Sequence, residues 1–520
     1  MDVTGARTLH RILSYHADTR PDATFLSFEG ADGTGEYTFA QLEIAANRFA
    51  HSLRSLGLSK GDRINLHLGN RPEFIIAWLG ASKLGVSVVP TNPAFSANEW
   101  RYIVEHSKAK VLLVEPAQLQ TAVELRDRLA MLRSMIVCGP EAEGLAFDAF
   151  LAAGDDRDPG VDVSAEDECA VNYTSGTTSR PKGVVTTHAN YVYAGESQGR
   201  HICLRPDDRY LVVLPFFHAS GQTHSTIPAL VFGASIAVMH RFSASRYFDQ
   251  VLGYDVTLGS LFAAPIRMIL SNPARPEHRK SRMRLALYAQ NVTTAQLDEW
   301  ERRYGVPLIQ IWGMTETMSL PVMEPVYGPR KRMSMGMAIY GYELRVVDPT
   351  GKEVVPGTVG ELVVRGVPGR TMMKEYHDNP QATAETLRGE WLYSGDNVRM
   401  DEDGYFFFVD RGKDLIKRAG ENVSAGEVEA IIREHPDVVD AAVIGVTDPM
   451  LDEVVKALVI RKAGSALGEA DVFEWCRARL TPFKVPALVE FREEFPRTSV
   501  GKIQKHLLRA EARHKLVRAP

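Results

Sequence analysis

The feature that most constrains the fold is an alternation of helical and strand-like patterns along roughly the first 400 residues. Apolar residues recur with helical spacing at 39–56 and 72–84, while 63–68 alternates and 86–90 is a short apolar run. Further short apolar runs at 110–114, 134–137 and 210–214 are typical of buried strands. Strands that alternate with helices predict parallel sheets covered by helices on both faces, so the fold class is α/β.

The pattern changes after Glu343. The strings ELRVVD, GELVVRG and GYFFFVD are short strands between turn residues, which predicts a small β-barrel-like subdomain. After Asp410 a charged segment leads to a helix start, with Ser424 as N-cap and Glu427 three residues later. A chain of 520 residues exceeds the roughly 250–300 that one core supports. We therefore expect an N-terminal domain at 1–410 and a small, mobile α+β C-terminal domain at 411–520.

Composition and charge exclude several functions. A formal net charge of −5 argues against a surface for nucleic acid or anionic membrane. No apolar stretch reaches the ~20 residues of a membrane span, and the N-terminus shows no secretory signal. The cysteines at 138, 169, 203 and 476 are too dispersed for a zinc site or a disulfide framework. We expect a cytoplasmic location.

The strongest local signal is the string YTSGTTSRPKGV at 173–184. Its glycines allow close backbone approach to a polyphosphate, and its hydroxyls and N–H groups are hydrogen-bond donors. Lys182 supplies a positive charge. The Walker pattern is absent from the sequence, so this is a different phosphate loop. Its candidate ATP-binding residues are Thr174, Ser175, Gly176, Thr177, Thr178 and Lys182.

Four more strings add chemistry in a fixed order: LPFFHASG at 214–221, IWGMTET at 311–317, YSGD at 393–396 followed by DRGKD, and PRTSVGKIQK from 496. Triphosphate binding usually requires Mg²⁺ and one or two carboxylates, which Glu316 could supply. Lys502, which directly follows a glycine, is either a site residue or one more solvated charge in a basic tail.

These strings together resemble the adenylate-forming superfamily of acyl-CoA synthetases, peptide-synthetase adenylation domains and luciferases. The resemblance runs from GDRINLHLGNRPEF, which begins near Gly61, to PRTSVGKIQK. TSRPKGVV, MKEYHDNPQATA and IKRAGENVS are most similar to the bacterial crotonobetaine/carnitine-CoA ligase branch. The resemblance implies that a carboxylic acid and MgATP give acyl-AMP and pyrophosphate. Coenzyme A would then displace AMP.

The resemblance also implies residue roles. Lys502 is implied as the catalytic lysine of the first step, Thr315 as an α-phosphate contact, and His218 as a group beside the acid. Glu316, with Thr177, would hold magnesium, and Lys413 would be the hinge. The remaining implied nucleotide contacts are Ala289, Gln290, Asn291, Trp312, Gly313, Met314, Asp396 and Arg411. The implied CoA contacts are Lys417, Arg418 and Gly420, and the acid pocket comprises His218, Gly221, Gln222, Tyr288 and Met318.

One segment departs from the family. Where most members have small residues against adenine, this chain has LYAQNVTT at 287–294. The bulk and hydrogen-bonding groups of Gln290 and Asn291 favour a small or polar acid. Transfer to a carrier protein, activation of nitrite or another small acid, and a non-enzymatic binding role stay open as alternatives. A homodimer is possible, and Arg267 could either pair with a second anionic group or face solvent.

Overall fold

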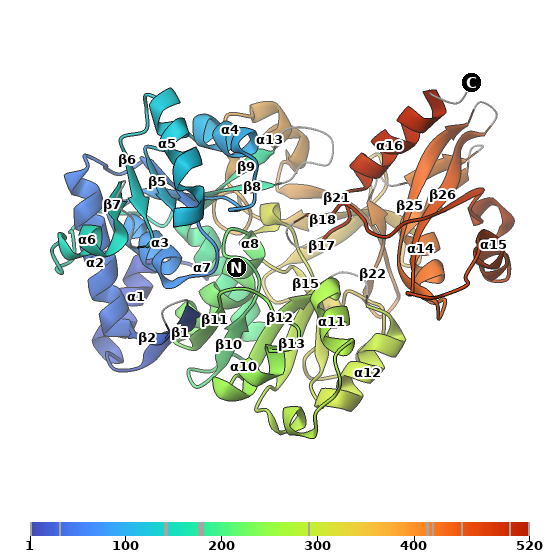
Figure 1. The fold of residues 1–520 in the computed structure, drawn as a ribbon, viewed down its shortest axis with the longest axis horizontal. Helices are drawn as coiled ribbons and strands as arrows, with labels where there is room; N and C mark the ends of the chain where they lie inside the picture. The colour runs from blue at the N-terminus through green and yellow to red at the C-terminus, as the bar shows by residue number, and fades with distance from the viewer. Residues whose placement is uncertain are drawn as a thin grey trace.

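The computed structural model describes residues 3–30, 33–139, 144–174, 181–289, 292–411, 415–418, 421–448, 451–498 and 501–517. Figure 1 shows a large N-terminal part, coloured blue to yellow, beside a smaller C-terminal part in orange and red. The large part contains two sheets with predominantly parallel strands and one antiparallel sheet, and the small part contains a fourth sheet. This is the expected fold class.

The first large sheet has the strand order β16-β15-β14-β13-β12-β10-β11-β1-β2. Its inner strands β10 to β14 run parallel, with antiparallel strands at both edges. The strands are β1 (Thr24–Gly30), β2 (Gly33–Thr38), β10 (Arg209–Val212), β11 (Ser235–Met239), β12 (Leu258–Phe262), β13 (Leu285–Ala289), β14 (Leu308–Trp312), β15 (Val322–Met323) and β16 (Met337–Ala338).

The second large sheet has the order β19-β9-β8-β4-β3-β5-β6-β7. Its strands are β3 (Arg63–His67), β4 (Ser87–Pro90), β5 (Val111–Val114), β6 (Ser134–Val137), β7 (Leu145–Ala146), β8 (Glu168–Thr174), β9 (Lys182–Thr187) and β19 (Glu375–Tyr376). Strands β8 and β9 form an antiparallel hairpin whose last described pair is Thr174 with Lys182. The phosphate-loop string connects these two strands.

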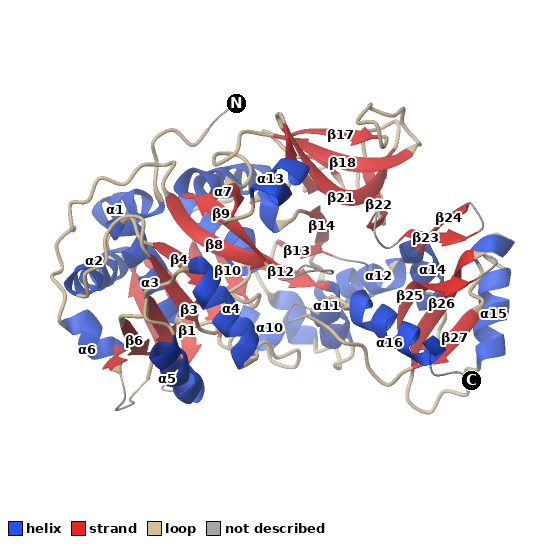
Figure 2. Cartoon of the chain, turned by 90° about the horizontal axis from the view of Figure 1, so that it is seen from above, coloured by secondary structure: helices blue, strands red, loops and turns tan. Residues whose placement is uncertain are grey.

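Helices cover both sheets, as the alternating pattern predicted (Figure 2). They are α1 (Leu9–Thr19), α2 (Phe39–Ser55), α3 (Pro72–Leu84), α4 (Ala97–Ser107), α5 (Leu119–Arg128), α6 (Phe147–Ala152), α7 (His188–His201), α8 (Ala219–Gly221), α9 (Ile227–Phe232), α10 (Tyr247–Gly253), α11 (Ala263–Leu270), α12 (Thr294–Tyr304) and α13 (Pro380–Thr386). Helices α3 and α7 are buried almost all round, because their sequences are apolar or small on every face.

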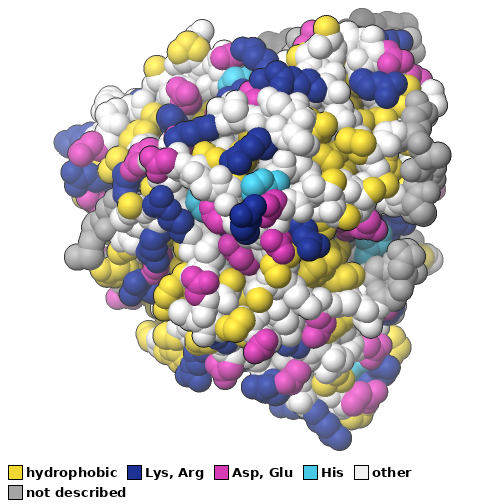
Figure 3. All heavy atoms as spheres, turned by 90° about the vertical axis from the view of Figure 1, so that its left-hand side faces the viewer, with side chains coloured by type: hydrophobic (Ala, Val, Ile, Leu, Met, Phe, Trp, Pro, Cys, Tyr) yellow, Lys and Arg dark blue, Asp and Glu magenta, His cyan; other side chains and the backbone are white. Residues whose placement is uncertain are grey.

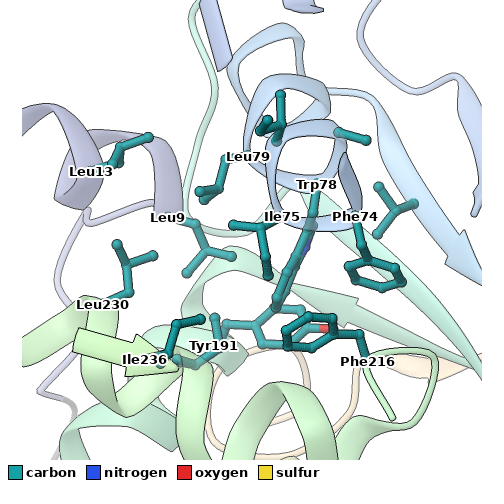
Figure 4. Packing of buried hydrophobic residues seen from close by; sticks show 14 of the residues in the cluster. Leu9, Leu13, Phe74, Ile75, Trp78, Leu79, Tyr191, Phe216, Leu230 and Ile236 are labelled. Carbon is teal, nitrogen blue, oxygen red and sulfur yellow. The ribbon is translucent and has the colours of Figure 1, made fainter. Parts of the chain in front are cut away.

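The main core is built around these two helices. Trp78 of α3 meets Tyr191 of α7 edge to face, with ring centroids 5.0 Å apart. Phe74 stacks on Phe216 at 5.3 Å. Figure 4 shows these rings pointing toward one another, with Leu9 from α1 and Ile236 from β11 beside them. Such aromatic burial removes large apolar areas from water and fixes the two sheets relative to each other.

The third sheet is antiparallel and has the order β17-β18-β21-β20, with β22 paired to β21. Its strands are β17 (Glu343–Val347), β18 (Val359–Arg365), β20 (Leu387–Arg388), β21 (Trp391–Met400) and β22 (Phe406–Arg411). Strands β17, β18 and β22 coincide with the three short strings after Glu343, and β20 and β21 lie between the second and third strings. This sheet is the predicted β-rich subdomain, and it has the form of a half-barrel.

The C-terminal sheet has the order β24-β23-β26-β25, with β27 paired to β26. Its elements are β23 (Leu415–Arg418), β24 (Glu421–Ser424), α14 (Ala425–Arg433), β25 (Val438–Asp448), β26 (Asp452–Arg461), α15 (Glu469–Arg477), β27 (Leu488–Phe491) and α16 (Lys505–Val517). Ser424 caps α14 as predicted, accepting a bond from the Glu427 N–H, but the Glu427 carboxylate pairs with Lys484. The capping box is therefore only half formed.

The surface is consistent with the modest net charge. On the face drawn in Figure 3, basic and acidic side chains are intermixed, and apolar side chains are exposed in small groups. No helix in the described ranges has the length and hydropathy needed to cross a bilayer.

Candidate active site

Several of the predicted site residues follow strands at the carboxyl edge of the first large sheet. Helix α11 begins directly after β12, and the IWGMTET string leaves β14 at Trp312. The His218 segment follows β10 in the same way. Loops at the carboxyl ends of parallel strands form the usual ligand-binding edge of an open α/β sheet. The sheet therefore collects segments that lie far apart in the sequence.

Glu316 and Lys182 meet through a tyrosine. Glu316 is buried in a single helical turn after β14, and its Oε1 accepts a hydrogen bond of 2.6 Å from the Tyr376 hydroxyl. Lys182 Nζ lies 4.7 Å from the centroid of the Tyr376 ring. Strand β19 brings Tyr376 there by pairing with β9. The phosphate-loop lysine and the proposed magnesium carboxylate thus belong to one site.

Trp312 and Asp396 connect the two nucleotide motifs. The Trp312 indole Nε1 donates a 2.9 Å hydrogen bond to Asp396 Oδ2, which fixes the carboxylate in a buried position. The backbone of Arg411 lies opposite Asp396 in the pairing of β21 with β22. Gly313 follows Trp312 where an added Cβ would lie 2.4 Å from the Ser319 carbonyl oxygen, so the tight turn requires glycine. Met314 and Thr315 are half-buried beside it.

Two histidines form the side of the site that faces Lys502. His218 precedes the short helix α8, and His224 lies on the π-helical turn Gln222–Thr226. Burial, and secondly the charge of Lys502, lowers the pKa of His218 to about 4 and that of His224 to about 3. Both imidazoles are therefore neutral near pH 7. His224 Nδ1 lies 3.3 Å from Ser260 Oγ.

Lys502 reaches this region on a turn of the C-terminal domain. Thr498 N–H donates to the Lys502 carbonyl at 2.8 Å, and Lys502 N–H donates to Thr498 Oγ1 at 3.1 Å. An added Cβ on Gly501 would lie 3.4 Å from the Ala264 side chain, so the turn rests on the start of α11. The domain orientation in this structure brings the lysine to the two histidines.

Arg267 has a partner. Its Nη2 lies 3.8 Å from Asp440 Oδ2 in the C-terminal domain. Of the two possibilities that the sequence left open, the structure therefore shows an anionic partner, and this partner belongs to the protein.

Three predicted pocket residues have their side chains in the core. The Gln222 amide donates to Phe216 O and accepts from the Tyr191 hydroxyl, and the Tyr288 hydroxyl donates to Gln310. Met318 packs in the main core. These contacts do not favour direct contact of the three side chains with the acid. Gly221 lies under Pro215, where an added Cβ would come within 2.2 Å of a carbonyl oxygen.

The candidate CoA contacts lie on the first hairpin of the C-terminal domain. The Arg418 guanidinium donates to the carbonyls of Phe483 at 2.6 Å and Val485 at 3.2 Å, which ties β23 to the 482–485 turn. Lys417 belongs to the same strand.

Several predicted residues lie outside the described part of the chain. They are Ser175, Gly176, Thr177 and Thr178 of the phosphate loop, Gln290 and Asn291 of the unusual segment, Lys413 and Gly420. Ala289, the last described residue of β13, is half-buried at the edge of the site. The roles predicted for these residues stay predictions.

Tyr376 and His224 are site residues that the motifs did not indicate. Tyr376 stands inside the quoted string MKEYHDNPQATA, but a tyrosine in a short edge strand carries no signal of a carboxylate partner. His224 is three residues beyond LPFFHASG. A π-helical turn, which is frequent at functional sites, rotates it toward the pocket, and no pattern in the sequence predicts that turn.

Comparison with known proteins agrees with this geometry. The family model described as AMP-binding enzyme matches residues 13–377, and its C-terminal domain model matches 427–502. A crotonobetaine/carnitine–CoA ligase of Salmonella typhimurium strain LT2 is 36% identical over 517 residues, covering 98% of this chain and 100% of the relative.

Among solved structures, the anthranilate CoA ligase AuaEII with anthranoyl-AMP has a TM-score of 0.90 at 28% identity, covering 98% of each chain. ATP-bound MatB from Rhodopseudomonas palustris has a TM-score of 0.88 at 28% identity, covering 97% of this chain and 99% of that one. The apo form of MatB, with equal identity and coverage, has a TM-score of 0.77. This chain therefore shares more of its overall arrangement with the ATP-bound form.

The chain belongs to the AMP-binding enzyme family. Within that family it is an AMP-forming acyl-CoA synthetase, an acid–thiol ligase that adenylates a carboxylic acid and transfers the acyl group to coenzyme A.

Proposed function

We propose that the first half-reaction takes place between Lys502, the His218–His224 pair and Glu316, and that the acid is small and polar. One observation carries this proposal: the turn of the C-terminal domain that carries Lys502 rests on the start of α11, where an added Cβ on Gly501 would lie 3.4 Å from the Ala264 side chain. After burial, the charge of Lys502 also contributes to the lowered pKa of His218 and His224. The histidines and Glu316 follow strands β10 and β14 of the first large sheet, and Asp396 lies within β21 of the antiparallel sheet. The lysine completes the site from the opposite domain.

Lys502 would act as an electrostatic catalyst. The acid carboxylate attacks the α-phosphorus of ATP, the P–O bond to the β-phosphate breaks, and pyrophosphate leaves with that electron pair. Both reacting groups are anions, so a cation that contacts both stabilises the transition state more than the separated reactants. The neutral imidazole of His218 would orient the acid. It need not remove a proton, because the nucleophile is already a carboxylate.

Glu316 and Thr177 are the residues that we propose to hold magnesium. Glu316 fits this role, because Tyr376 engages its Oε1 only and a second carboxylate oxygen can accept another ligand. No cluster of three or more His, Cys, Asp or Glu side chains suited to a metal occurs in the described ranges. Mg²⁺ bound to ATP typically takes only one or two protein carboxylates. When bound, the ion would neutralise phosphate charge, while Thr315 contacts the α-phosphate.

Asp396 would accept hydrogen bonds from the ribose hydroxyls. The Trp312 indole holds one of its oxygens, so the orientation of the carboxylate is set before the nucleotide binds. Arg411 would be the second nucleotide contact. After adenylation, rotation of the C-terminal domain about Lys413 would bring Lys417, Arg418 and Gly420 to the pantetheine arm of CoA.

The acid class is supported by neutral, polar groups on the N-terminal side of the site. His218, His224 and Ser260 offer hydrogen bonds without adding charge, and Arg267 is engaged by Asp440. A short acid that carries a polar or quaternary ammonium group fits such a site better than a long alkyl chain. The Salmonella relative, named for crotonobetaine and carnitine, is consistent with that class.

The test is product analysis with MgATP and a panel of acids, with and without CoA. The panel comprises crotonobetaine, carnitine, malonate, benzoate, anthranilate and octanoate. We expect AMP and pyrophosphate with the small polar acids and a CoA thioester only when CoA is present. A preference for octanoate or benzoate would contradict the acid class. AMP formation without any thioester would favour a carrier-protein acceptor.

We also propose the domain boundary near Asp410, a cytoplasmic location and a possible homodimer. Light scattering on the purified chain tests the dimer through its mass. Fractionation of expressing cells tests the location.

A further inference from the structure

Asp440 is surrounded by arginines from three separate segments. It lies at the start of β25 and is only 3% exposed. Arg433 Nε of α14 lies 2.7 Å from its Oδ1, and Arg497 Nη2 lies 2.5 Å from its Oδ2. Arg267 of α11 approaches the same Oδ2 from the other domain. The Asp440 carboxylate therefore forms ion pairs with three arginines, one of which belongs to the other domain.

One of these arginines holds the turn that carries Lys502. Arg497 Nη1 donates a 2.9 Å hydrogen bond to the carbonyl of Gly501, the residue before the lysine. Arg497 also pairs with Ile503 as an antiparallel bridge, which closes the turn. A short path therefore leads from the Asp440 carboxylate through one guanidinium to the backbone of Lys502.

A second arginine, Arg267, lies on the helix of the other domain against which the turn packs. Arg267 lies one helical turn after Ala264 on α11, and Ala264 faces Gly501. Asp440 and Gly501 thus contact the same helix, one by charge and one by close packing. When the C-terminal domain rotates for the second half-reaction, the Arg267–Asp440 contact must break, whereas the Arg433 and Arg497 contacts stay within the domain.

Asp440 and its arginine partners are charged at neutral pH, which favours these contacts. Burial would raise the pKa of Asp440, but the charges of Arg433 and Arg267 and the hydrogen bond from Arg497 outweigh it and bring the pKa to about 2. Burial lowers the pKa of Arg267, and Asp440 opposes that shift. Arginine stays charged in proteins, so the attraction between the two persists at neutral pH.

We propose that Asp440 is a positioning residue for the first half-reaction. Through Arg497 it sets the turn that carries Lys502, and through Arg267 it docks that turn on α11. The inference rests on the proposed role of Lys502. It adds that the docking contact is specific to acyl-AMP formation and contributes nothing to thioester formation.

Arg267→Met is the informative variant, because it removes the charge that faces Asp440 from the opposite domain and leaves the sequence of the C-terminal domain unchanged. Asp440→Asn would remove the buried charge that three partly buried guanidinium groups share, and it could unfold the domain. Methionine preserves much of the apolar stem and removes the charge. Arg267→Lys is the rescue variant, since an attraction across 3.8 Å needs a charge more than a planar fork. Arg282→Met, which breaks an exposed pair with Asp255, is the matched control.

The half-reactions are measured separately on the full-length variants. Acid-dependent ATP–pyrophosphate exchange reports the first step, with the panel acid that gives the fastest wild-type exchange. Thioester formation from premade acyl-AMP and CoA reports the second. We expect Arg267→Met to lower kcat for exchange about 10- to 100-fold with little change in KM for ATP, because misplacing a catalytic group by ~1 Å has effects of that size. The second step should stay within about twofold, Arg267→Lys should recover most of the exchange rate, and Arg282→Met should match the wild type.

Hydrogen–deuterium exchange gives a readout that needs no acid. The amides of Thr498, Gly501 and Lys502 are hydrogen-bonded within the turn. Arg267→Met, a change in the opposite domain, should speed their exchange several-fold, whereas Arg282→Met should not. Unchanged exchange in the turn would overturn the docking contact.

Two failures can be told apart. If Lys502→Ala retained pyrophosphate exchange, or if no panel acid supported exchange, the proposed function itself would fail. If Lys502→Ala abolished exchange while Arg267→Met lowered both half-reactions equally, or neither, only the positioning role of Asp440 would be refuted.

Discussion

The core of the N-terminal domain and its contact with the C-terminal domain are held by different forces. The core joins Trp78, Tyr191 and Phe216 in close aromatic packing, away from water. The contact near the acid pocket relies on Arg267 and Asp440, with Lys502 on an exposed turn. Apolar burial is lost only by exposing large areas to water, whereas Arg267 can exchange Asp440 for water while Asp440 keeps Arg433 and Arg497. The N-terminal part of the site uses the first force, and the part that we propose to move between half-reactions uses the second.

Trp78→Ala should destabilise the core of the N-terminal domain. Removing a buried indole leaves a cavity in the main core, and such changes lower the free energy of unfolding by about 3–5 kcal/mol. Denaturant unfolding followed by circular dichroism measures the loss. Tyr15→Ala, at a side chain that is 63% exposed on the neighbouring helix α1, is the control and should change stability by less than about 0.5 kcal/mol. A loss below about 1 kcal/mol for Trp78→Ala would contradict the assignment of that core.

Lys502→Ala should impair acyl-AMP formation without destabilising the core of the N-terminal domain. We expect acyl-AMP formation to fall at least 10²–10³-fold, which is the usual effect of removing one electrostatic donor from a transition state. Thioester formation from premade acyl-AMP should be largely preserved, and so should the thermal unfolding temperature. Single-turnover assays of each half-reaction distinguish these effects. Equal loss in both would contradict the two-orientation mechanism.

Acid should destabilise the N-terminal domain through its buried histidines. Burial lowers the pKa of His67 to about 3 and the pKa of His188 to about 4. Both values lie below the pKa of about 6.5 expected in the unfolded chain. The unfolded state therefore binds more protons as the pH falls below 6.5. Stability is fully present above that pH and is lost progressively toward the folded-state pKa, by up to about 1.4 kcal/mol per pH unit for each histidine.

His67→Gln tests this pH dependence. His67 stacks on Trp100 at 3.7 Å and hydrogen-bonds Thr91, so glutamine costs some packing but cannot titrate. Thermal unfolding between pH 7 and pH 4.5 should show a shallower decline for the variant than for the wild type. An identical decline would mean that other groups control the acid sensitivity.

Lys413→Pro should have the smallest effect of these changes. A proline restricts φ at the proposed hinge and limits the range of orientations available to the C-terminal domain. We expect thioester formation to slow several-fold while acyl-AMP formation changes less. Overall turnover equal to that of the wild type would place the hinge elsewhere.

Much of the fold was predictable from local patterns. The period of apolar residues located α2, α3 and strands β3 to β6 within one or two residues, because a buried face imposes its spacing on the sequence. Turn residues after Glu343 predicted the half-barrel sheet, because Gly, Asp and Pro mark the ends of short strands. The capping box at Ser424 was only half correct, because Lys484, distant in sequence, attracts the Glu427 carboxylate more strongly than the local N–H does.

The residues that carry the chemistry of the site stand in recognisable sequence motifs. Their contact partners do not. The sequence by itself indicated that Lys182, Glu316, Asp396 and Lys502 belong to one nucleotide-dependent site, because each stands in a motif of the family that the chain resembles. Only the tertiary structure decided that Tyr376 holds Glu316, that Trp312 holds Asp396 and that Arg267 meets Asp440. Those contacts join residues 60 or more positions apart, and no local periodicity records which distant side chains the packing of sheets and domains will bring together.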